Sequence, residues 1–321
     1  MATKEQTSFL EVLRWSDDQC REYLEGMRWP DGPHCPKCGT GDPWKITRRS
    51  ESKNAVRSLY RCRECKRQFT ATVGTIFEDS KIPLNKWFAA IYLMCASKKG
   101  ISAHQLHRQL DVTYKSAWFM CHRVREAMRD KTSLPFTGTI EADETYIGGK
   151  PRRHPAKKRG TMPQAVSDAK RKKVPVFGMI ERDGRVRTIV IKPIDKKRVQ
   201  ATILENIDPE RSRLITDESF LYDGISRHLP HDTVRHADTY ITGDAIHTQA
   251  IENAWSLLKR GIYGVFHHVT EGHLPEYLSE FDYRFNRRKI SDAERFAALM
   301  GQTQGRLLWF CQTPQPENPH A

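Results

Sequence analysis

The sequence predicts a multidomain chain in which an N-terminal helical segment, a four-cysteine module and a helical domain precede an α/β domain with a helical C-terminal region. Three observations lead to this prediction. Two Cys-x-x-Cys pairs lie near the N-terminus, amphipathic helical segments follow them, and strand-like apolar runs alternate with helical ones from residue 139 onward. At 321 residues the chain is long enough for two or three domains with separate cores.

The charge of the chain indicates the kind of partner it meets. Lys and Arg number 53 and Asp and Glu number 39, which gives a formal net charge of +14. So large an imbalance costs self-repulsion, and a nucleic-acid partner explains it better than a basic surface that only aids solubility. The sequence has no apolar run of about 18 residues that would span a membrane, and its first residues lack the pattern of a signal peptide. We therefore expect a cytoplasmic protein.

Changes of composition and Pro- and Gly-rich interruptions divide the chain into six expected segments. They are the N-terminal helical segment (1–32), the four-cysteine module (33–78), the helical domain (79–134), the α/β domain (135–272), the C-terminal helical region (273–311) and a disordered, Pro-rich tail (312–321). The apolar spacing predicts one helix over residues 5–30 and another from Leu84, after Pro83, to about Lys99.

The four-cysteine module has the pattern of a zinc ribbon. Cys35-Pro-Lys-Cys38 and Cys62-Arg-Glu-Cys65 are two tight knuckles, and together they supply four thiolates for a tetrahedral Zn²⁺ site. A cytosolic setting argues against two disulfides. So small a module cannot bury a sufficient core without metal. Basic residues crowd the knuckles, so the ribbon either contacts DNA or serves only as a scaffold.

The helical domain has the dimensions of a helix-turn-helix. Ser102 can N-cap a first helix that ends at Leu110, and Thr113 can N-cap a second helix through about Met128. In such motifs the start of the second helix meets base edges, and basic residues along it meet phosphates. The residues expected to contact DNA are Tyr114, Lys115 and Arg123. The alternative is an ordinary helical bundle with a solvated basic face.

The α/β domain shows the element order of an RNase H-like fold. The expected order is a strand, two hairpin strands joined by Arg-Asp-Gly, a helix, a strand, a weaker strand, a helix and a final helical region. The bounds are 139–147, 174–181, 185–194, 196–207, 213–216, 233–236, 248–259 and 274–309. In this layout two strands and a covering helix each bring one acid to a shared site: Asp143, Asp217 and Glu252.

Three segments resemble a known family. Ala142-Asp-Glu-Thr-Tyr-Ile-Gly-Gly-Lys150, Ile215-Thr-Asp217 and the stretch from Ile251 to Gly264 are similar to the DDE transposases of zinc-ribbon bacterial insertion sequences, which are relatives of the Merlin transposons. With the cysteine module, the resemblance covers residues 15–290. It implies an enzyme associated with the bacterial nucleoid that binds terminal inverted repeats and cleaves and joins double-stranded DNA, as a homodimer or larger synaptic assembly.

The resemblance also implies a catalytic site. Asp143, Asp217 and Glu252 would hold two Mg²⁺ or Mn²⁺ ions, which prefer oxygen ligands. Lys259 is similar to the basic residue that follows the third acid in many of these enzymes, and it would share the helix face of Glu252. Asn253 is the alternative third ligand, but a helix turns about 100° per residue, so both side chains cannot face the site equally. The nearby acids Glu141, Glu144, Glu218, Asp223 and Asp244 are interpreted mostly as surface charge.

A long basic loop spans residues 150–173, with Asp168 as its one acid. It is too long for an ordinary hairpin connection, and it either follows DNA beside the active site or is a disordered charged insert. The further residues expected to contact DNA are Arg152, Arg153, Lys157, Lys158, Arg159, Arg171, Lys172 and, on the helix of Glu252, Arg260.

Two other functions stay open from the sequence. One is a zinc-ribbon DNA-binding regulator with an inactive RNase H-like domain, although the presence of all three acids argues against it. The other is a nuclease of the same fold that lacks strand transfer. The choice between a cut-and-paste and a copy-type route, and the sequences of the repeats and target, stay open too.

Overall fold

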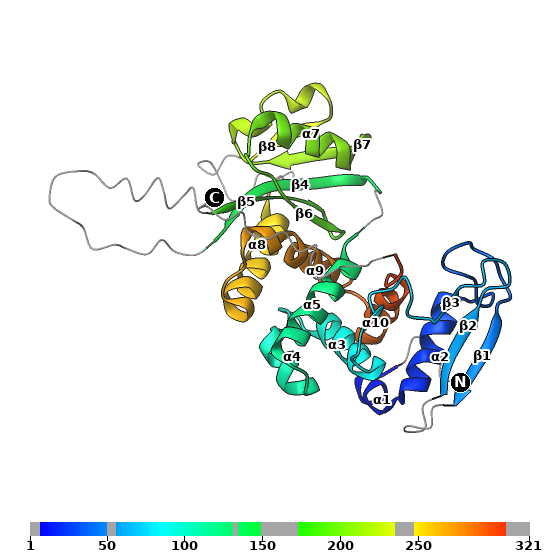
Figure 1. The fold of residues 1–321 in the computed structure, drawn as a ribbon. Helices are drawn as coiled ribbons and strands as arrows, with labels where there is room; N and C mark the ends of the chain where they lie inside the picture. The colour runs from blue at the N-terminus through cyan, green and yellow to red at the C-terminus, as the bar shows by residue number, and fades with distance from the viewer. Residues whose placement is uncertain (1–6, 50–55, 131–133, 149–172, 235–246, 306–321) are drawn as a thin grey trace, which may run out of the picture. The chain divides into compact units, whose positions relative to one another are not determined.

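The computed structural model describes residues 7–49, 56–130, 134–148, 173–234 and 247–305 (Figure 1). The chain forms two compact units, one of residues 1–129 with 287–321 and the other of residues 130–286. The C-terminal helical region expected at 273–311 is therefore divided between the two units. None of the helices in the described ranges is long and apolar enough to cross a membrane.

The first unit begins with two helices, α1 (Phe9–Arg14) and α2 (Asp17–Arg28), where the sequence predicts a single helix over residues 5–30. Ser16 causes the interruption, because its side chain accepts a hydrogen bond from the amide of Gln19 and the Gln19 side chain accepts one from the amide of Ser16. This capping box starts a new helix inside the apolar pattern.

Three short antiparallel strands follow α2 and form the zinc-ribbon sheet: β1 (Trp44–Arg49), β2 (Val56–Arg61) and β3 (Gln68–Phe69). Its buried face carries an aromatic cluster. The Tyr60 and Phe69 rings stack with centroids 5.6 Å apart, and Trp29, which follows α2, packs edge-on at 5.6 Å from Tyr60 and 6.0 Å from Phe69. This cluster attaches the sheet to α2.

The remaining helices of the first unit form the helical domain: α3 (Leu84–Ala96), α4 (Ala103–Leu110), α5 (Tyr114–Met128) and α10 (Asp292–Gly301). Both predicted N-caps are confirmed, since Ser102 accepts from the amide of Gln105 and Thr113 from that of Ser116. Asp111 adopts the left-handed conformation that ends α4. The helix α10 packs on α3, where Phe296 meets aromatic rings of the core.

The second unit is built on a five-stranded mixed sheet. Its strands are β4 (Phe136–Ile147), β5 (Val174–Glu181), β6 (Val186–Val190), β7 (Ile207–Thr216) and β8 (His231–Thr233), in the spatial order β6-β5-β4-β7-β8. The hairpin strand β5 is antiparallel to β4, whereas β7 is parallel to β4 and β8 to β7. This is the RNase H-like sheet that the element order predicts, although β7 begins six residues before the expected Arg213.

Helices cover both faces of this sheet, as Figure 1 shows. On one face α7 (Lys196–Asn206) packs against inward residues of β4 such as Ile140 and Ala142. On the other face α8 (Gln249–Gly261) and α9 (Leu274–Asn286) pack against Val176 and Ile180. The short turns are η1 (Phe220–Tyr222), η2 (Ile225–Arg227), the π-helical η3 (Ile262–Phe266) and η4 (Glu271–His273).

Gly178 on β5 allows α8 to approach the sheet closely. It pairs with Asp143 across the two strands. A Cβ atom at position 178 would lie 2.4 Å from Cη2 of Trp255 and 3.2 Å from Cδ1 of Ile251, both on α8. The first distance is far below van der Waals contact, so the indole ring can lie against the strand only because this residue has no side chain.

Replacing Gly178 by alanine is expected to push Trp255 off the sheet. Overpacking of this kind costs about 1–3 kcal/mol of unfolding free energy, which urea denaturation followed by circular dichroism would measure. Gly264→Ala is the matched control, because a Cβ atom there meets nothing within 4 Å. Equal stability of the two variants would contradict the packing argument.

Candidate active site and metal centres

Asp143 lies on the central strand β4 and faces α8. Its Oδ2 accepts a hydrogen bond of 2.9 Å from the indole Nε1 of Trp255. Burial, together with the negative charges of Glu144 and Asp217, raises the pKa of Asp143 to about 6. The carboxylate is therefore held in a fixed orientation and lies close enough to other acids to be repelled by them.

Asp217 follows the last residue of β7, the parallel neighbour of β4. The register pairs Glu141 with Ile215, so Asp143 and Asp217 each stand two residues beyond this last pair of the two strands. The Asp217 charge adds to burial in raising the pKa of Asp143, so the two carboxylates interact. The Oδ1 atom of Asp217 accepts a hydrogen bond of 3.1 Å from the amide of Ser219, which orients the side chain at the strand end. Two adjacent carboxylates that repel one another are a donor set suited to a hard divalent cation.

Glu252 lies in the first turn of α8 and is exposed. Its Oε1 accepts a hydrogen bond of 3.0 Å from the Thr248 hydroxyl. At about 100° per residue, Glu252 is about 60° around the helix from Trp255, whose indole touches Asp143, whereas Asn253 is about 160° away. The helix geometry therefore favours Glu252 over Asn253 as the side chain on the Asp143 side. Lys259 is about 40° from Trp255 on the same side.

The three acids do not form a closed cluster like that of the cysteines. Within the described ranges, the one group of three or more His, Cys, Asp or Glu residues whose ligand atoms all lie within 4.8 Å of one another is Cys35, Cys38, Cys62 and Cys65. The structure thus places Asp143 on β4, Asp217 directly after the neighbouring strand β7, and Glu252 on the helix whose Trp255 contacts Asp143.

The four cysteine sulfurs have the spacing of a zinc site. The Sγ atoms of Cys35 and Cys65 are 3.6 Å apart, and those of Cys38 and Cys62 are 3.4 Å apart. A tetrahedral Zn²⁺ with bonds of about 2.3 Å separates its sulfur ligands by about 3.8 Å. The Cys38 sulfur also lies 3.3 Å from the Thr40 hydroxyl, a polar contact that favours the thiolate and helps to lower the pKa of Cys38 to about 6. The set fits Zn²⁺.

Comparison with known families identifies the two domains in which these residues lie. Residues 135–286 match the ISXO2-like transposase domain, and residues 9–68 match the transposase zinc-ribbon domain. The chain belongs to the ISXO2-like transposases with an N-terminal zinc ribbon. The domain implies phosphoryl transfer on DNA with a divalent metal.

This transposase is 28% identical over 282 residues to an uncharacterized protein in the transposable element ISH50 of Halobacterium salinarum, an alignment that covers 84% of this chain and 90% of that protein. Among solved structures, the Mos1 strand transfer complex matches with a TM-score of 0.22 and 12% identity, covering 67% of this chain and 78% of the other. A pre-cleavage Mos1 transpososome matches with a TM-score of 0.22 and 11% identity, covering 94% and 98%.

The DNA-contact residues expected on α5 of the transposase differ in exposure. Tyr114 and Lys115 are exposed at the start of the helix, and the Tyr114 ring stacks on His104 of α4 with centroids 4.3 Å apart. Arg123 is only 3% exposed, and its Nη1 donates hydrogen bonds of 2.7 Å to the carbonyl oxygens of Ile76 and Glu78. This corrects the expectation for Arg123, whose guanidinium is used within the fold and cannot reach a phosphate.

The other DNA-contact residues expected from the sequence lie on the basic loop and on α8. Arg260 is exposed on α8 and donates a hydrogen bond of 2.8 Å to the Ser256 hydroxyl. Asp244 and the expected disordered tail lie outside the described residues. So do the loop residues Arg152, Arg153, Lys157, Lys158, Arg159, Arg171 and Lys172.

Two acids interpreted as surface charge are instead part of the second unit's interior. Glu141 is fully buried on the α8 side of β4. Glu144 accepts a hydrogen bond of 2.7 Å from the Tyr222 hydroxyl, and burial raises its pKa. The sequence could have indicated this position for Glu141. Side chains alternate between the two faces of a strand, and Glu141 stands two residues before Asp143, so both side chains face the same side of β4.

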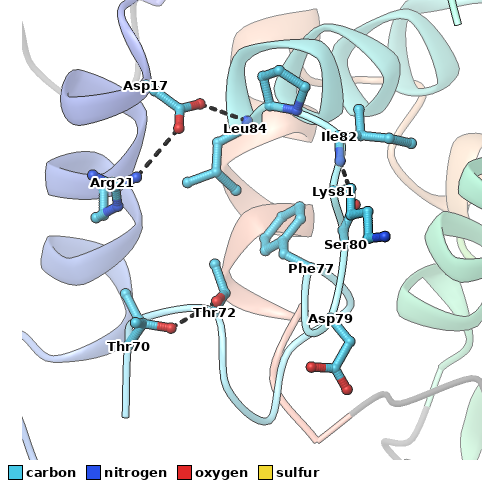
Figure 2. A pocket seen from close by; sticks show the side chains of 12 residues that line it. Asp17, Arg21, Thr70, Thr72, Phe77, Asp79, Ser80, Lys81, Ile82 and Leu84 are labelled. Carbon is cyan, nitrogen blue, oxygen red and sulfur yellow. Dashed lines mark hydrogen bonds and ion pairs between the residues drawn. The ribbon is translucent and has the colours of Figure 1, made fainter. Parts of the chain in front are cut away.

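A cavity of about 530 Å³ lies in the first unit between α2 and the segment before α3 (Figure 2). Two of its charged lining residues, Asp17 and Arg21, form an ion pair. Asp17 also accepts a hydrogen bond of 2.7 Å from the amide of Leu84. These pairings stabilise the junction of α2 with α3.

Removing zinc is expected to unfold the ribbon, because so few buried residues hold it together. Purified protein should contain about one zinc per chain. Cys62→Ser should lose that zinc and expose the Tyr60 and Phe69 cluster to quenchers of fluorescence. Cys95→Ala is the control, since Cys95 is buried in α3 outside the cluster. Full zinc content in Cys62→Ser would contradict the four-thiolate site.

Proposed function

We propose that this chain is a DNA transposase that binds the terminal inverted repeats of an insertion sequence and catalyses metal-dependent strand cleavage and strand transfer. The observation that carries the proposal is the placement of Asp143 on β4 and of Asp217 at the end of the parallel neighbour β7, where burial and the charges of Glu144 and Asp217 raise the pKa of Asp143. Acids that lie close together in a partly buried site repel one another, and in so basic a chain cation binding is the explanation we favour for them.

In this proposal Asp143, Asp217 and Glu252 hold Mg²⁺ or Mn²⁺. Two such ions, when bound, assist the attacking oxygen and stabilise the leaving oxygen of a phosphodiester. Trp255 fixes the orientation of Asp143, and Thr248 fixes that of Glu252. Lys259 lies on the same side of α8, and its positively charged ammonium group would bind a phosphate oxygen.

The reaction needs no protein nucleophile. In cleavage, water attacks the phosphorus at the element end and the 3′ oxygen leaves as a hydroxyl group. In strand transfer, that 3′-OH attacks a target phosphodiester, and the 3′ oxygen of the target strand leaves. The residues named above would bind and orient the reacting groups in both steps, which differ only in the attacking oxygen.

DNA binding would be shared among several basic surfaces. The helix-turn-helix formed by α4 and α5 would present Tyr114 and Lys115 to a groove. The loop over residues 150–173 and Arg260 would contact phosphates beside the active site. Because transposition joins two element ends, a homodimer or larger assembly is expected to hold both ends together.

Alanine at Asp143, Asp217 or Glu252 is expected to abolish cleavage of labelled element ends and to leave DNA binding intact. Loss of a metal ligand removes several kcal/mol of transition-state stabilisation, which lowers the rate by about 10³-fold or more. The assay compares Mg²⁺ with EDTA and scores both nicked and joined products. Asn253→Ala should cleave normally. An inactive Asn253→Ala beside an active Glu252→Ala would reverse the assignment, and nicking without joining would indicate a nuclease.

Lys115→Ala is expected to weaken DNA binding at every salt concentration. A lost phosphate contact lowers the slope of log affinity against log salt by about one unit, whereas a lost base contact relaxes sequence preference. Fluorescence anisotropy over a salt series measures both effects. Lys81→Ala, at an exposed lysine in the loop before α3, is the control. Identical binding by the two variants would argue against the helix-turn-helix assignment.

A further inference from the structure

Glu141 is a buried carboxylate that the reaction scheme above does not use. It stands on β4 two residues before Asp143, so the alternation of the strand directs both side chains to the face that α8 covers. Its side chain is 0% exposed. Burial of a charge costs several kcal/mol unless polar partners compensate it, so the partners of Glu141 show what the charge is used for.

Those partners are at the start of α8 and on the neighbouring hairpin. The Oε2 atom of Glu141 accepts hydrogen bonds from the backbone amides of Ala250, at 2.7 Å, and Ile251, at 3.1 Å. The Oε1 atom accepts one of 3.1 Å from Nε of Arg182. Arg182 in turn donates to the carbonyl oxygen of His247 at 3.2 Å. A strand carboxylate therefore occupies the positive end of a helix that follows it by 109 residues.

Thr248 leaves the start of α8 without the usual side-chain cap, so the helix amides need another acceptor. It is the N-cap residue of α8, yet its side chain accepts no hydrogen bond from the helix amides. Its hydroxyl donates instead to Oε1 of Glu252. An uncapped helix start leaves backbone amides without acceptors. Glu141 supplies the acceptor that an N-cap side chain normally provides, and Thr248 is thereby left to orient Glu252.

A second contact fixes the same helix to the same strand. Trp255 donates to Asp143 at 2.9 Å. Ile251 and Trp255 are about 6 Å apart along the helix axis, and Glu141 and Asp143 are about 6.6 Å apart along the strand. Because these spacings match, two carboxylates of β4 hold α8 at two points. Glu252 directly follows the residue held by the first point.

We propose that Glu141 is a positioning residue, whose carboxylate sets the register of α8 on β4 and so determines where Glu252 stands relative to Asp143. It acts through the helix and contacts neither metal nor DNA. This inference rests on the proposed function, in which Asp143, Asp217 and Glu252 bind metal together.

Glu141→Gln tests the inference, because glutamine keeps the size but removes the charge and turns an NH₂ group toward the donors that Glu141 now accepts from. In the full-length, zinc-loaded protein, Mn²⁺ binding measured by calorimetry is expected to weaken by about 10–100-fold. Hydrogen exchange of the peptide that contains Ala250 and Ile251 should become faster, and DNA affinity should not change.

Glu181→Gln is the matched control. Glu181 pairs with Arg185 at 2.8 Å on the same sheet, and it accepts from the amides of Thr137 and Arg185. This variant loses a comparable Glu–Arg pair and should bind Mn²⁺ like the wild type. A drop in affinity shared by both variants would reduce the role of Glu141 to general stability and overturn the inference.

The outcomes separate the inference from the proposed function. A folded Glu141→Gln protein with wild-type Mn²⁺ affinity and wild-type exchange would refute the positioning role. If Asp143→Ala bound Mn²⁺ as well as the wild type does, the proposed metal site would fail instead, whatever Glu141 does. If Glu141→Gln did not fold, Glu141→Asp would take its place, since it keeps the charge but withdraws the oxygens from α8 by about 1.5 Å. It should show the same two effects.

Discussion

The close seating of α8 on the central strands is the constraint on which the second unit depends. Gly178 leaves room for the Trp255 indole, and the indole then reaches Asp143 with its one polar atom. A bulkier residue at position 178 would separate the helix from the sheet. The same contact buries apolar surface and fixes a carboxylate. At this contact, packing of the helix and orientation of the site carboxylate therefore depend on the same two residues, Gly178 and Trp255.

Much of this architecture is visible in the sequence because it depends on local patterns. Ser102 and Thr113 precede helices as short polar caps, and their hydrogen bonds are local. Asp143 lies within a strand-like run and Asp217 ends a short apolar run, and the two strands concerned are neighbours in the sheet. The cysteine knuckles predict their own geometry, because each pair is only four residues long. At these caps and knuckles one short segment holds the whole signal, and the prediction agrees with the structure.

The features that the sequence did not indicate depend on partners far away in the chain. Arg123 has the appearance of a phosphate contact, but the segment at Ile76 and Glu78 crosses it and takes its hydrogen bonds. Glu141 resembles surface charge, but the start of α8 covers it. The single helix expected over residues 5–30 fails for a different reason. The capping box at Ser16 is a local signal that a continuous apolar pattern conceals.

The carboxylates on the α8 side of the sheet differ in how their charges are compensated. Glu141 is neutralised within the fold, by a guanidinium and by two amides at the positive end of a helix. Asp143 receives a hydrogen bond from a neutral indole, while burial and then repulsion by Glu144 and Asp217 raise its pKa. Burial without compensation costs free energy that folding alone does not recover. A bound cation would supply the missing compensation at Asp143 and Asp217 but has no such role at Glu141. The distribution of charge therefore distinguishes Glu141, whose charge is compensated within the fold, from the carboxylates whose charge is left available to metal.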